Sequence, residues 1–444
     1  VGWPVTPDAI KWTAKLLYER YNVPIYVSEN GMACHDTVSL DGKVHDHNRV
    51  DYLNRYLLKL GEAIDEGADV RGYFVWSFMD NFEWADGYKQ RFGIVYVDFA
   101  SQRRIVKDSA FWYQKIIETN GRMLTMNQTT KEILFLDPVC THNIWGGTRL
   151  RTEFGYPVEG DDIGECWGIS AHPNGDGSIR NGVYAGMKLS KVWEEHPEVF
   201  GNLAYDRFPL LTKIIDAKAD LSIQVHPDDA YAKEHENGSF GKTECWYIMD
   251  APENATLVIG HNAKTKEELA SMIHEGRWSE FIREIPVKKG DFIQIDPGTV
   301  HAIKGGLLIL ETQQTSDITY RVYDYDRLQN GRPRELHIEK SIDVITVPAK
   351  SVEDSVTSAT GLPENQLNEL YACGYYQIYK LDVNGTCSFA QNYPFLLMSV
   401  LEGSGIVNGQ PVKKGDHFIL PCGFGEVEMQ GEMSLVVSTV PAQA

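Results

Sequence analysis

The sequence lacks the features that mark several classes of protein. Its 62 acidic residues outnumber 42 basic ones, and the formal net charge of −20 opposes binding to nucleic acid or to anionic lipid. No apolar run approaches the ~18–20 residues that cross a bilayer, and no secretory leader is recognisable. We therefore expect a cytoplasmic protein that has neither nucleic acid nor a membrane as its partner.

Cysteines are few and irregularly placed. The seven cysteines among 444 residues form no CxxC pair, which excludes a disulfide framework and a cysteine-rich metal site. We expect reduced and mostly buried thiols. The composition, with 43% hydrophobic and 23% charged residues, is typical of a globular protein, and the length predicts two to four domains.

Residues 1–122 alternate between helical and strand-like patterns. Helices are predicted at 8–21, along the apolar stripe from Val50 to Ile64, and at 108–121, and strands are predicted at 23–28 and 72–78. Both strands are apolar runs, and a helix lies between them, which is typical of parallel strands joined by a crossover helix. The first part of the chain is therefore predicted to have an α/β fold.

The sequence pattern changes at about residue 131. From there, short predicted strands alternate with Gly, Pro and Asp turns, and a helical patch is predicted at 262–285. Such spacing predicts an antiparallel sandwich or barrel. The segments VKKGDFIQIDPG (287–298) and VKKGDHFILPCG (412–423) are alike, which suggests two related barrels in tandem. With a linker at 350–366, the expected domains are 1–122, 123–349 and 367–444.

Three motifs in the first part carry a resemblance. YVSENG (26–31), WSFMDNFEWADGY (76–88) and RFGIVYVDF (91–99) stand in this order, and the segment resembles the C-terminal end of family-one glycoside hydrolases, the retaining β-glucosidases. The resemblance implies a fragment of a (β/α)8, or TIM, barrel. It also implies roles in this sequence: Glu29 as nucleophile, Glu83 and Trp84 as ligands of the sugar hydroxyls, and Trp76 as a wall of the cleft.

The fragment lacks the partner that such an enzyme needs. Retaining glycosidases use two carboxylates ~5–5.5 Å apart, and the N-E-P motif that supplies the acid in this family is absent from the 444 residues. Only two strands of a barrel that takes eight are visible. We interpret residues 1–122 as an inactive remnant. Two alternatives stay open: a β-glucosidase whose acid comes from the second half or another chain, or a surface that binds glucose or β-glucosides. The open strands also predict association with the second half or between chains.

A metal site is predicted in the middle of the chain. Gln224 and His226 are two residues apart, so both point to the same face of a strand. Glu244 lies in a later strand pattern, and His301 follows the turn Asp296-Pro297-Gly298. Two imidazoles, a carboxylate and an amide oxygen are a mixed ligand set that suits Zn²⁺ and leaves a position for substrate.

The same region resembles the type I mannose-6-phosphate isomerases, which are zinc enzymes of the cupin fold. The motifs that carry the resemblance are IWGG, GECWGIS, FPLLTKIIDA, LSIQVHP, PGTVHAI and LETQQTSDITYRVYDYDR, in this order. The resemblance implies that Gln224, His226, Glu244 and His301 bind zinc, and that a phosphosugar, mannose 6-phosphate, is converted to fructose 6-phosphate through an enediol. The expected fold class is mixed: a TIM-barrel fragment joined to a mainly-β, tandem cupin-type (jelly-roll) isomerase with a helical insertion.

Further roles follow from the resemblance and from the chemistry of an enediol. Arg321 matches a catalytic arginine and is suited to stabilise the enediolate because it stays charged. Glu311 is the candidate for proton transfer, and Lys242 shares a face with Glu244 and is a candidate for polarisation or a proton relay. Lys213 and Ser222 match positions near the substrate phosphate. The last barrel has only His417 and is expected to be structural.

Overall fold

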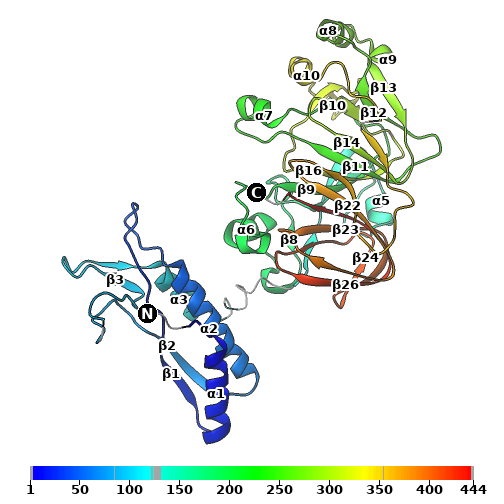
Figure 1. The fold of residues 1–444 in the computed structure, drawn as a ribbon. Coiled ribbons are helices and arrows are strands. Elements are labelled where there is room, and N and C mark those ends of the chain that lie inside the picture. The colour runs from blue at the N-terminus through cyan, green and yellow to red at the C-terminus, as the bar shows by residue number, and fades with distance from the viewer. Residues whose placement is uncertain (1–3, 85, 122–123, 125–131, 354, 442–444) are drawn as a thin grey trace. The chain divides into compact units, whose positions relative to one another are not determined.

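The computed structural model describes residues 4–84, 86–121, 124, 132–353 and 355–441. The chain divides into two compact units, Val1–Thr130 and Lys131–Ala444 (Figure 1). The expected domain boundary at 122–123 lies outside the described residues. No described helix is both long and apolar enough to cross a membrane. All seven cysteines are free thiols, and each is buried or half-buried.

The first unit is a small α/β layer. Its elements are α1 (Asp8–Tyr21), β1 (Ile25–Asn30), α2 (His47–Asp65), β2 (Val70–Val75), β3 (Val95–Val97), β4 (Arg104–Val106) and α3 (Asp108–Glu118). β1 and β2 pair in parallel, as the sequence pattern predicted. Their side chains Val27, Tyr73 and Val75 pack against the buried faces of the helices, because alternate residues of a strand point to one face. The helices therefore cover one face of a two-stranded sheet.

Buried charges hold the loops of this unit together. Lys107 is fully buried, and its ammonium lies 2.5 Å from an oxygen of Asp36 and 2.8 Å from one of Asp80. The Arg49 guanidinium, also buried, bonds Asp36 at 2.8 Å and contacts Asp46. Opposite charges inside a protein are tolerated when they are paired in this way. The unit thus has an ionic centre beside its apolar clusters.

The second unit begins with a sandwich of two antiparallel sheets. One sheet has the order β13-β12-β15-β10-β17 and the other β20-β14-β11-β16-β9-β7-β6. The bounds are β6 (Val139–Gly147), β7 (Ile163–Ile169), β9 (Leu210–Asp216), β10 (Ile223–Val225), β11 (Glu244–Asp250), β12 (Thr256–His261), β13 (Ile282–Pro286), β14 (Asp291–Ile295), β15 (His301–Ala302), β16 (Leu308–Gln314), β17 (Tyr320–Tyr323) and β20 (Val356–Ser358). Trp246 of β11 and Ile259 of β12 belong to one buried apolar cluster, which lies between the sheets. The expected mainly-β, cupin-type architecture is therefore confirmed.

Short helices pack beside the five-stranded sheet. They are α7 (Asp229–His235), α8 (Lys266–His274), α9 (Trp278–Phe281) and α10 (Ile338–Val344). Asp228 and Thr265 cap the N-termini of α7 and α8, because their side chains accept hydrogen bonds from backbone N–H groups of the first turn. The predicted helical patch at 262–285 is correct for α8 and α9 but too long at its end. β13 begins at Ile282, because the chain there joins the edge of the sheet beside β12.

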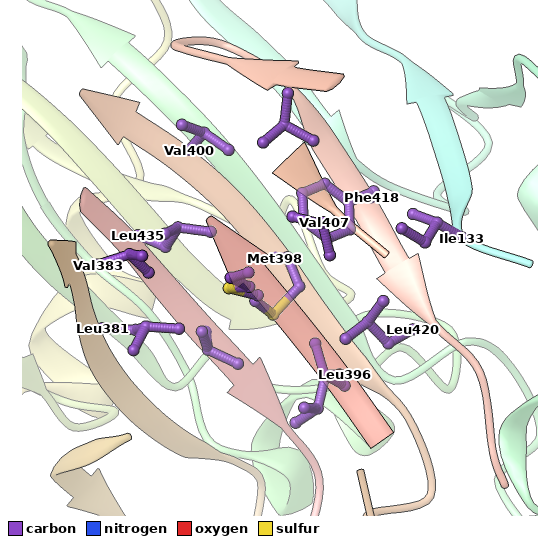
Figure 2. Close-up of a cluster of buried hydrophobic side chains, with 14 of the residues drawn as sticks. Ile133, Leu381, Val383, Leu396, Met398, Val400, Val407, Phe418, Leu420 and Leu435 are labelled. Carbon is purple, nitrogen blue, oxygen red and sulfur yellow. The ribbon is translucent and has the colours of Figure 1, made fainter. Parts of the chain in front are cut away.

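A second β-structure completes the unit, with strand order β21-β22-β26-β23-β25-β5-β8 and β24 paired to β23. Its bounds are β5 (Leu134–Asp137), β8 (Ser178–Ile179), β21 (Asn368–Ala372), β22 (Gln377–Gln391), β23 (Leu396–Val407), β24 (Gln410–Lys413), β25 (His417–Leu420) and β26 (Gly425–Thr439). Figure 2 shows its core, where Met398, Phe418 and Leu435 point toward one another. β5 and β8 come from far upstream, so this sheet is not built from 367–444 alone.

The internal repeat forms two equivalent turns. Lys288 N–H donates to Asp291 Oδ2 at 2.9 Å, and Lys413 N–H donates to Asp416 Oδ2 at 2.9 Å. Each turn contains a glycine with a positive φ, +88° at Gly290 and +90° at Gly415. This backbone conformation favours glycine. The turns lead into β14 and β25. This likeness supports the prediction of two related barrels.

The linker predicted at 350–366 is partly wrong. Val356 to Ser358 form β20, which pairs with β14 at the edge of the seven-stranded sheet. Val352 and Val356 also pack against the apolar cluster of the sandwich. Its described residues pack on the sandwich because they satisfy backbone groups of an edge strand and half-bury two valines. Neither contact is visible in the Ser- and Thr-rich composition.

Candidate metal and substrate site

One sheet of the sandwich supplies three of the four predicted ligands. Gln224 lies in β10, between β15 and β17, and is paired with His301 on one side and Arg321 on the other. His226 directly follows β10 and shares the face of Gln224, as their spacing predicted. Neighbouring strands therefore bring together residues that are up to about a hundred positions apart in sequence.

The facing sheet supplies the acidic and basic groups. Glu244 starts β11, and Glu311 lies on the adjacent β16, opposite Trp246 of β11 and Lys213 of β9. Lys242 comes two residues before Glu244, with its side chain buried. The two sheets thus present complementary groups to one another across the sandwich.

The predicted ligand atoms converge. His226 Nε2 lies 3.1 Å from His301 Nε2, and Glu244 lies 3.2 Å from His301 Nε2 and 3.5 Å from His226 Nε2. The side-chain amide of Gln224 is 3.3 Å from His301 Nε2. All three charged or imidazole ligands are fully buried. Residues in or beside three strands, β10, β11 and β15, therefore lie around one point.

Backbone carbonyls orient both imidazoles. Nδ1–H of His226 donates to Ile318 O at 2.7 Å, and Nδ1–H of His301 donates to Thr299 O at 2.8 Å. With Nδ1 protonated, each neutral ring turns the lone pair of Nε2 toward the other ring. Burial lowers the pKa of His226 well below its usual range and that of His301 to about 3, so neither ring carries a proton on Nε2 at neutral pH.

The turn before His301 sets the position of that ring. Gly298 has a φ of +81°, and its N–H donates to the carbonyl of His226 at 2.9 Å. A Cβ at this glycine would come within 2.4 Å of Thr346 Oγ1. Glycine is required here both for the backbone conformation and for space. The turn therefore ties the two histidine segments together.

The cluster fits a divalent cation. Two Nε2 lone pairs 3.1 Å apart repel one another unless a proton or a cation lies between them. Both buried oxygens of Glu244 lack a well-aligned hydrogen-bond donor, although the Lys242 ammonium lies 2.6 Å from Oε2. The Gln224 amide nitrogen faces His301 Nε2, and exchanging the nitrogen and oxygen by a 180° flip of the amide points the oxygen toward the two histidines and Glu244. A mixed set of nitrogen and oxygen ligands is typical of sites for zinc and similar ions.

The neighbouring charges hold Glu311 ionised. Its Oε1 lies 3.0 Å from Lys213 Nζ and 3.6 Å from Lys242 Nζ, and Trp246 Nε1–H donates to Oε2 at 2.9 Å. Burial alone would raise the pKa of Glu311, but the two lysines outweigh it and lower the pKa to about 2. Burial raises the pKa of Glu244 to about 7, and the negative charge of Glu311 adds to this effect. The two carboxylates are therefore unequal.

A pocket of about 320 Å³ opens beside the cluster. The site residues predicted from sequence that line it are Lys213, Ser222, Gln224, Lys242, Glu311 and Arg321. Burial, together with the positive charge of Arg334, lowers the pKa of Arg321, whose Nη1–H donates to Glu335 O at 2.7 Å. The polar residues of the wall and the ligand cluster form one continuous site.

Three charged residues of this wall were not predicted from the sequence: Glu165, Asp317 and Arg334. Glu165 lies 3.3 Å from Lys213 Nζ, and Arg334 lines the pocket while it pairs with Asp324. Glu165 stands in the motif GECWGIS, so a search for an acidic partner of Lys213 would have found it. No signal in the sequence singles out Arg334, which directly follows a short hairpin, 328–333, that comes after the pocket strands.

The glycosidase-like residues lie in the first unit. Glu29 is exposed near the carboxyl end of β1, and the next residue, Asn30, bonds the hydroxyls of Tyr52 at 3.2 Å and Tyr73 at 2.8 Å. The side chain of Trp84 is 96% exposed and that of Trp76 36% exposed, and Glu83 is half-buried. Glu29 lies in β1, whereas Trp76, Glu83 and Trp84 follow β2.

Comparisons with known proteins separate the same two units. Residues 133–266 match the family model of the type I phosphomannose isomerase catalytic domain, and residues 367–440 match that of the mannose-6-phosphate isomerase cupin domain. The mannose-6-phosphate isomerase ManA of Bacillus subtilis is 49% identical over 323 residues, which make up 70% of this chain and 99% of that protein. A crystal structure of the mannose 6-phosphate isomerase from Bacillus subtilis matches with 47% identity and a TM-score of 0.64, over 69% of this chain and 99% of that one.

Residues 1–122 match the model of glycosyl hydrolase family 1. Beta-glucosidase A of Thermotoga maritima is 53% identical over 122 residues, which are 27% of this chain and 27% of that protein. The match therefore spans only about a quarter of the length of this relative.

Proposed function

Because the chain belongs to the type I phosphomannose isomerase family, we propose that it interconverts mannose 6-phosphate and fructose 6-phosphate at the site between the two sheets. The observation that supports this most directly is the convergence of Gln224, His226, Glu244 and His301 beside a polar pocket. An open-chain sugar phosphate needs both a cation near its carbonyl end and positive charge near its phosphate, and the pocket offers both.

We infer that these four residues hold a zinc ion. A bound Zn²⁺ supplies Lewis-acid polarisation of the carbonyl and hydroxyl oxygens of the sugar. The buried histidines stay neutral and are ready to act as ligands, and their Nδ1–H bonds keep them from rotating. Lys242 would serve as a proton relay beside the metal, because its Nζ lies 2.6 Å from Glu244 Oε2 and 3.1 Å from His226 Nε2.

Two side chains of the pocket, Arg321 and Glu311, would stabilise the charge of the enediolate and move the proton between C2 and C1. Arg321 faces the pocket from β17 and keeps its positive charge, so it can stabilise an enediolate oxygen. Glu311 is ionised and therefore able to accept the proton that leaves C2 and return it to C1. Its two lysine partners make it a weak base, so substrate binding must loosen at least one of these contacts for efficient transfer.

We propose that the phosphate lies toward Lys213 and Ser222. Lys213 is buried between Glu165 and Glu311, and these carboxylates raise its pKa against the effect of burial. Its charge is shared with them, so Arg334, on the same pocket wall, is a further cation for the phosphate. Arginine is suited to this because it binds a phosphate through two parallel hydrogen bonds.

Metal removal tests this assignment. Treatment with a chelator is expected to abolish isomerisation, and added Zn²⁺ is expected to restore it. His226→Gln should lose both activity and bound zinc, measured by mass spectrometry of the metal content, whereas His274→Gln, at an exposed histidine of α8, should lose neither. Full activity of a metal-free sample would contradict the proposal.

For the first unit we infer a fragment of a (β/α)8 barrel with a sugar-binding surface. The parallel pairing of β1 and β2, with helices on one face, supports the barrel origin. Glu29, Trp76, Glu83 and Trp84 would contact glucose or a β-glucoside, and calorimetry with cellobiose tests this. Binding that persists in Trp84→Ala would contradict it, since this ring is the most exposed aromatic side chain described.

A further inference from the structure

Among the described residues, two clusters of side chains bring three metal-ligating groups close together. One is the isomerase cluster of the second unit. The other lies on the first unit and consists of His45, His47 and Asp108, each of which offers a ligand atom within 4.8 Å of the other two. These three residues stand outside the glycosidase motifs, and the proposed isomerase chemistry does not use them.

The backbone places His45 beside Asp108. Val44 and Lys107 form a parallel β-bridge, and Asp108 N–H donates to Val44 O at 3.2 Å. His45 and Asp108 each follow one residue of this bridge, so they become neighbours although they are 63 positions apart in sequence. His45 Nδ1 lies 2.6 Å from Asp108 Oδ2. The pairing of two backbone segments therefore brings these two side chains together.

Buried residues hold the same segments in place. Asp46 is buried, and its carboxylate accepts hydrogen bonds from Ser109 N–H at 2.8 Å and Ser109 Oγ–H at 2.6 Å. Val44 is also buried, whereas His45 and His47 are exposed. Because buried and exposed residues alternate here, both imidazoles face solvent, and their rings lie nearly parallel with centroids 6.1 Å apart. The scaffold of the cluster is thus fixed, while its ligand atoms are accessible.

A second carboxylate orients the ring of His45. Asp41 Oδ2 lies 3.1 Å from His45 Nε2, and Lys43 N–H donates to Oδ1 of the same aspartate at 3.0 Å. With Nε2–H donated to Asp41, the neutral ring directs the lone pair of Nδ1 toward Asp108. Metal-ligating histidines are commonly held by a carboxylate in this way. No hydrogen bond or ion pair among the described residues involves the side chain of His47, so its ring nitrogens are available to a ligand.

We propose that His45, His47 and Asp108 bind a divalent transition-metal ion, such as Zn²⁺, at a site separate from the isomerase cluster. Two imidazoles and one carboxylate suit Zn²⁺, Ni²⁺ or Cu²⁺ better than Mg²⁺ or Ca²⁺, which prefer oxygen ligands. Tetrahedral Zn²⁺ keeps its ligand atoms about 3.3 Å apart, so the distances in the cluster would change by about 1.5 Å or less. The ion would take the place of the proton between His45 Nδ1 and Asp108.

The local charges and the exposure limit the affinity of this site. α2 begins at His47 and α3 at Asp108, and the N-terminus of a helix disfavours a cation. The negative charges of Asp41 and Asp108 offset this effect. The side chains of His45 and Asp108 are 38% and 32% exposed, so water can fill the remaining positions around the ion. We therefore expect weaker binding here than at the fully buried isomerase cluster.

A bound ion would link separate parts of the first unit. His47 starts α2, Asp108 starts α3, and His45 belongs to the loop that leads into α2. An ion that binds these residues only in the folded chain stabilises the folded state. The site is thus assigned a structural role, since it holds helix ends and a loop together and no reaction is ascribed to it.

Counting bound metal ions tests the proposal. The full 444-residue chain, His47→Gln and His274→Gln would be dialysed against the same Zn²⁺ buffer, and bound zinc would be measured by mass spectrometry. We expect the wild type and His274→Gln to hold one more equivalent than His47→Gln. His274 is an exposed histidine 3.7 Å from a carboxylate oxygen of Glu339, so it controls for casual binding. Zinc at the isomerase cluster is common to all samples, so the difference does not depend on the proposed function.

Two further variants separate ligands from their surroundings. Asp108→Asn should lose the same equivalent. Asp41→Asn should keep the ion but weaken its affinity by about tenfold or more, because this carboxylate only orients a ligand. On the wild-type chain, Zn²⁺ should block modification of His45 and His47 by diethyl pyrocarbonate, mapped by peptide mass spectrometry, without affecting His274. Equal zinc in the wild type, His47→Gln and Asp108→Asn would overturn the proposal, as would unprotected His45 and His47 or an equal loss of zinc in His274→Gln.

Discussion

His417 is expected to make the stability of the second unit depend on pH. Its ring is fully buried on β25, with Nδ1 2.8 Å from Ser399 Oγ and Nε2 3.0 Å from Tyr156 Oη. The Tyr156 hydroxyl donates to Gly415 O at 2.9 Å, so it accepts from Nε2–H, while Nδ1 accepts from the serine hydroxyl. A neutral ring is thus fully satisfied, and a second proton on Nδ1 would displace the hydrogen bond that the serine hydroxyl donates.

The size of the effect follows from the difference in pKa between the folded and unfolded chains. Burial lowers the pKa of His417 from 6.5 to about 4. Because the folded state binds this proton more weakly than the unfolded state does, the stabilising contribution is present above pH 6.5 and is lost as the pH falls toward 4. A tenfold difference in proton affinity corresponds to about 1.4 kcal/mol, so the full loss is about 3 kcal/mol, of which about 2 kcal/mol is lost by pH 5.

Urea unfolding at pH 7.5 and pH 5 measures this loss. Other groups also titrate in this range, so the comparison is with His417→Gln, which removes the titration and keeps a polar side chain. The variant is less stable at pH 7.5, but its stability should fall by about 2 kcal/mol less between the two pH values. His274→Gln, at an exposed position, should behave as the wild type does. Equal losses in the wild type and His417→Gln would refute the reasoning.

Three further predictions concern other parts of the molecule. Lys107→Met leaves the carboxylates of Asp36 and Asp80 buried without their ammonium and should destabilise the first unit by about 3–5 kcal/mol, measured by proteolysis of that unit. Arg321→Gln should lower kcat by about 10²-fold or more with zinc content unchanged, and a loss of zinc instead would assign it a structural role. Gly298→Ala should weaken zinc retention, because the added Cβ meets Thr346 and shifts the His301 turn; unchanged metal affinity would contradict this.

Local patterns predicted much of the fold. The apolar stripe of α2, the two buried runs of β1 and β2, and the matching turns before β14 and β25 each depend on neighbouring residues, so periodicity and turn chemistry were sufficient. The same holds for Gln224 and His226, whose spacing places them on one face of any strand. The composition of 350–366 wrongly predicted a linker throughout. The edge of β14, with which β20 pairs, lies more than fifty residues earlier and could not be inferred from this segment alone.

Long-range pairings could not be predicted in this way. Nothing near Leu134 indicates that β5 joins the sheet of the last barrel through β25, more than two hundred residues later. The paired lysines of Glu311 are another example, since the residues identified Lys213 and Lys242 as cations but not as partners of one carboxylate. Such contacts depend on which strands become neighbours, and pattern alone leaves that choice open.

The sequence by itself determined the classes of element, the glycosidase and isomerase motifs, and the shared strand face of the candidate ligands Gln224 and His226, because each depends on residue types at short spacing. Only the tertiary structure decided that two sheets bring the four candidate ligands to within hydrogen-bonding distance, that Glu311 is ionised while the pKa of Glu244 is raised, and that the first unit has an uncovered face. The physical reason is that distances, burial and charge pairing arise from contacts between distant segments, and these exist only once the chain has folded.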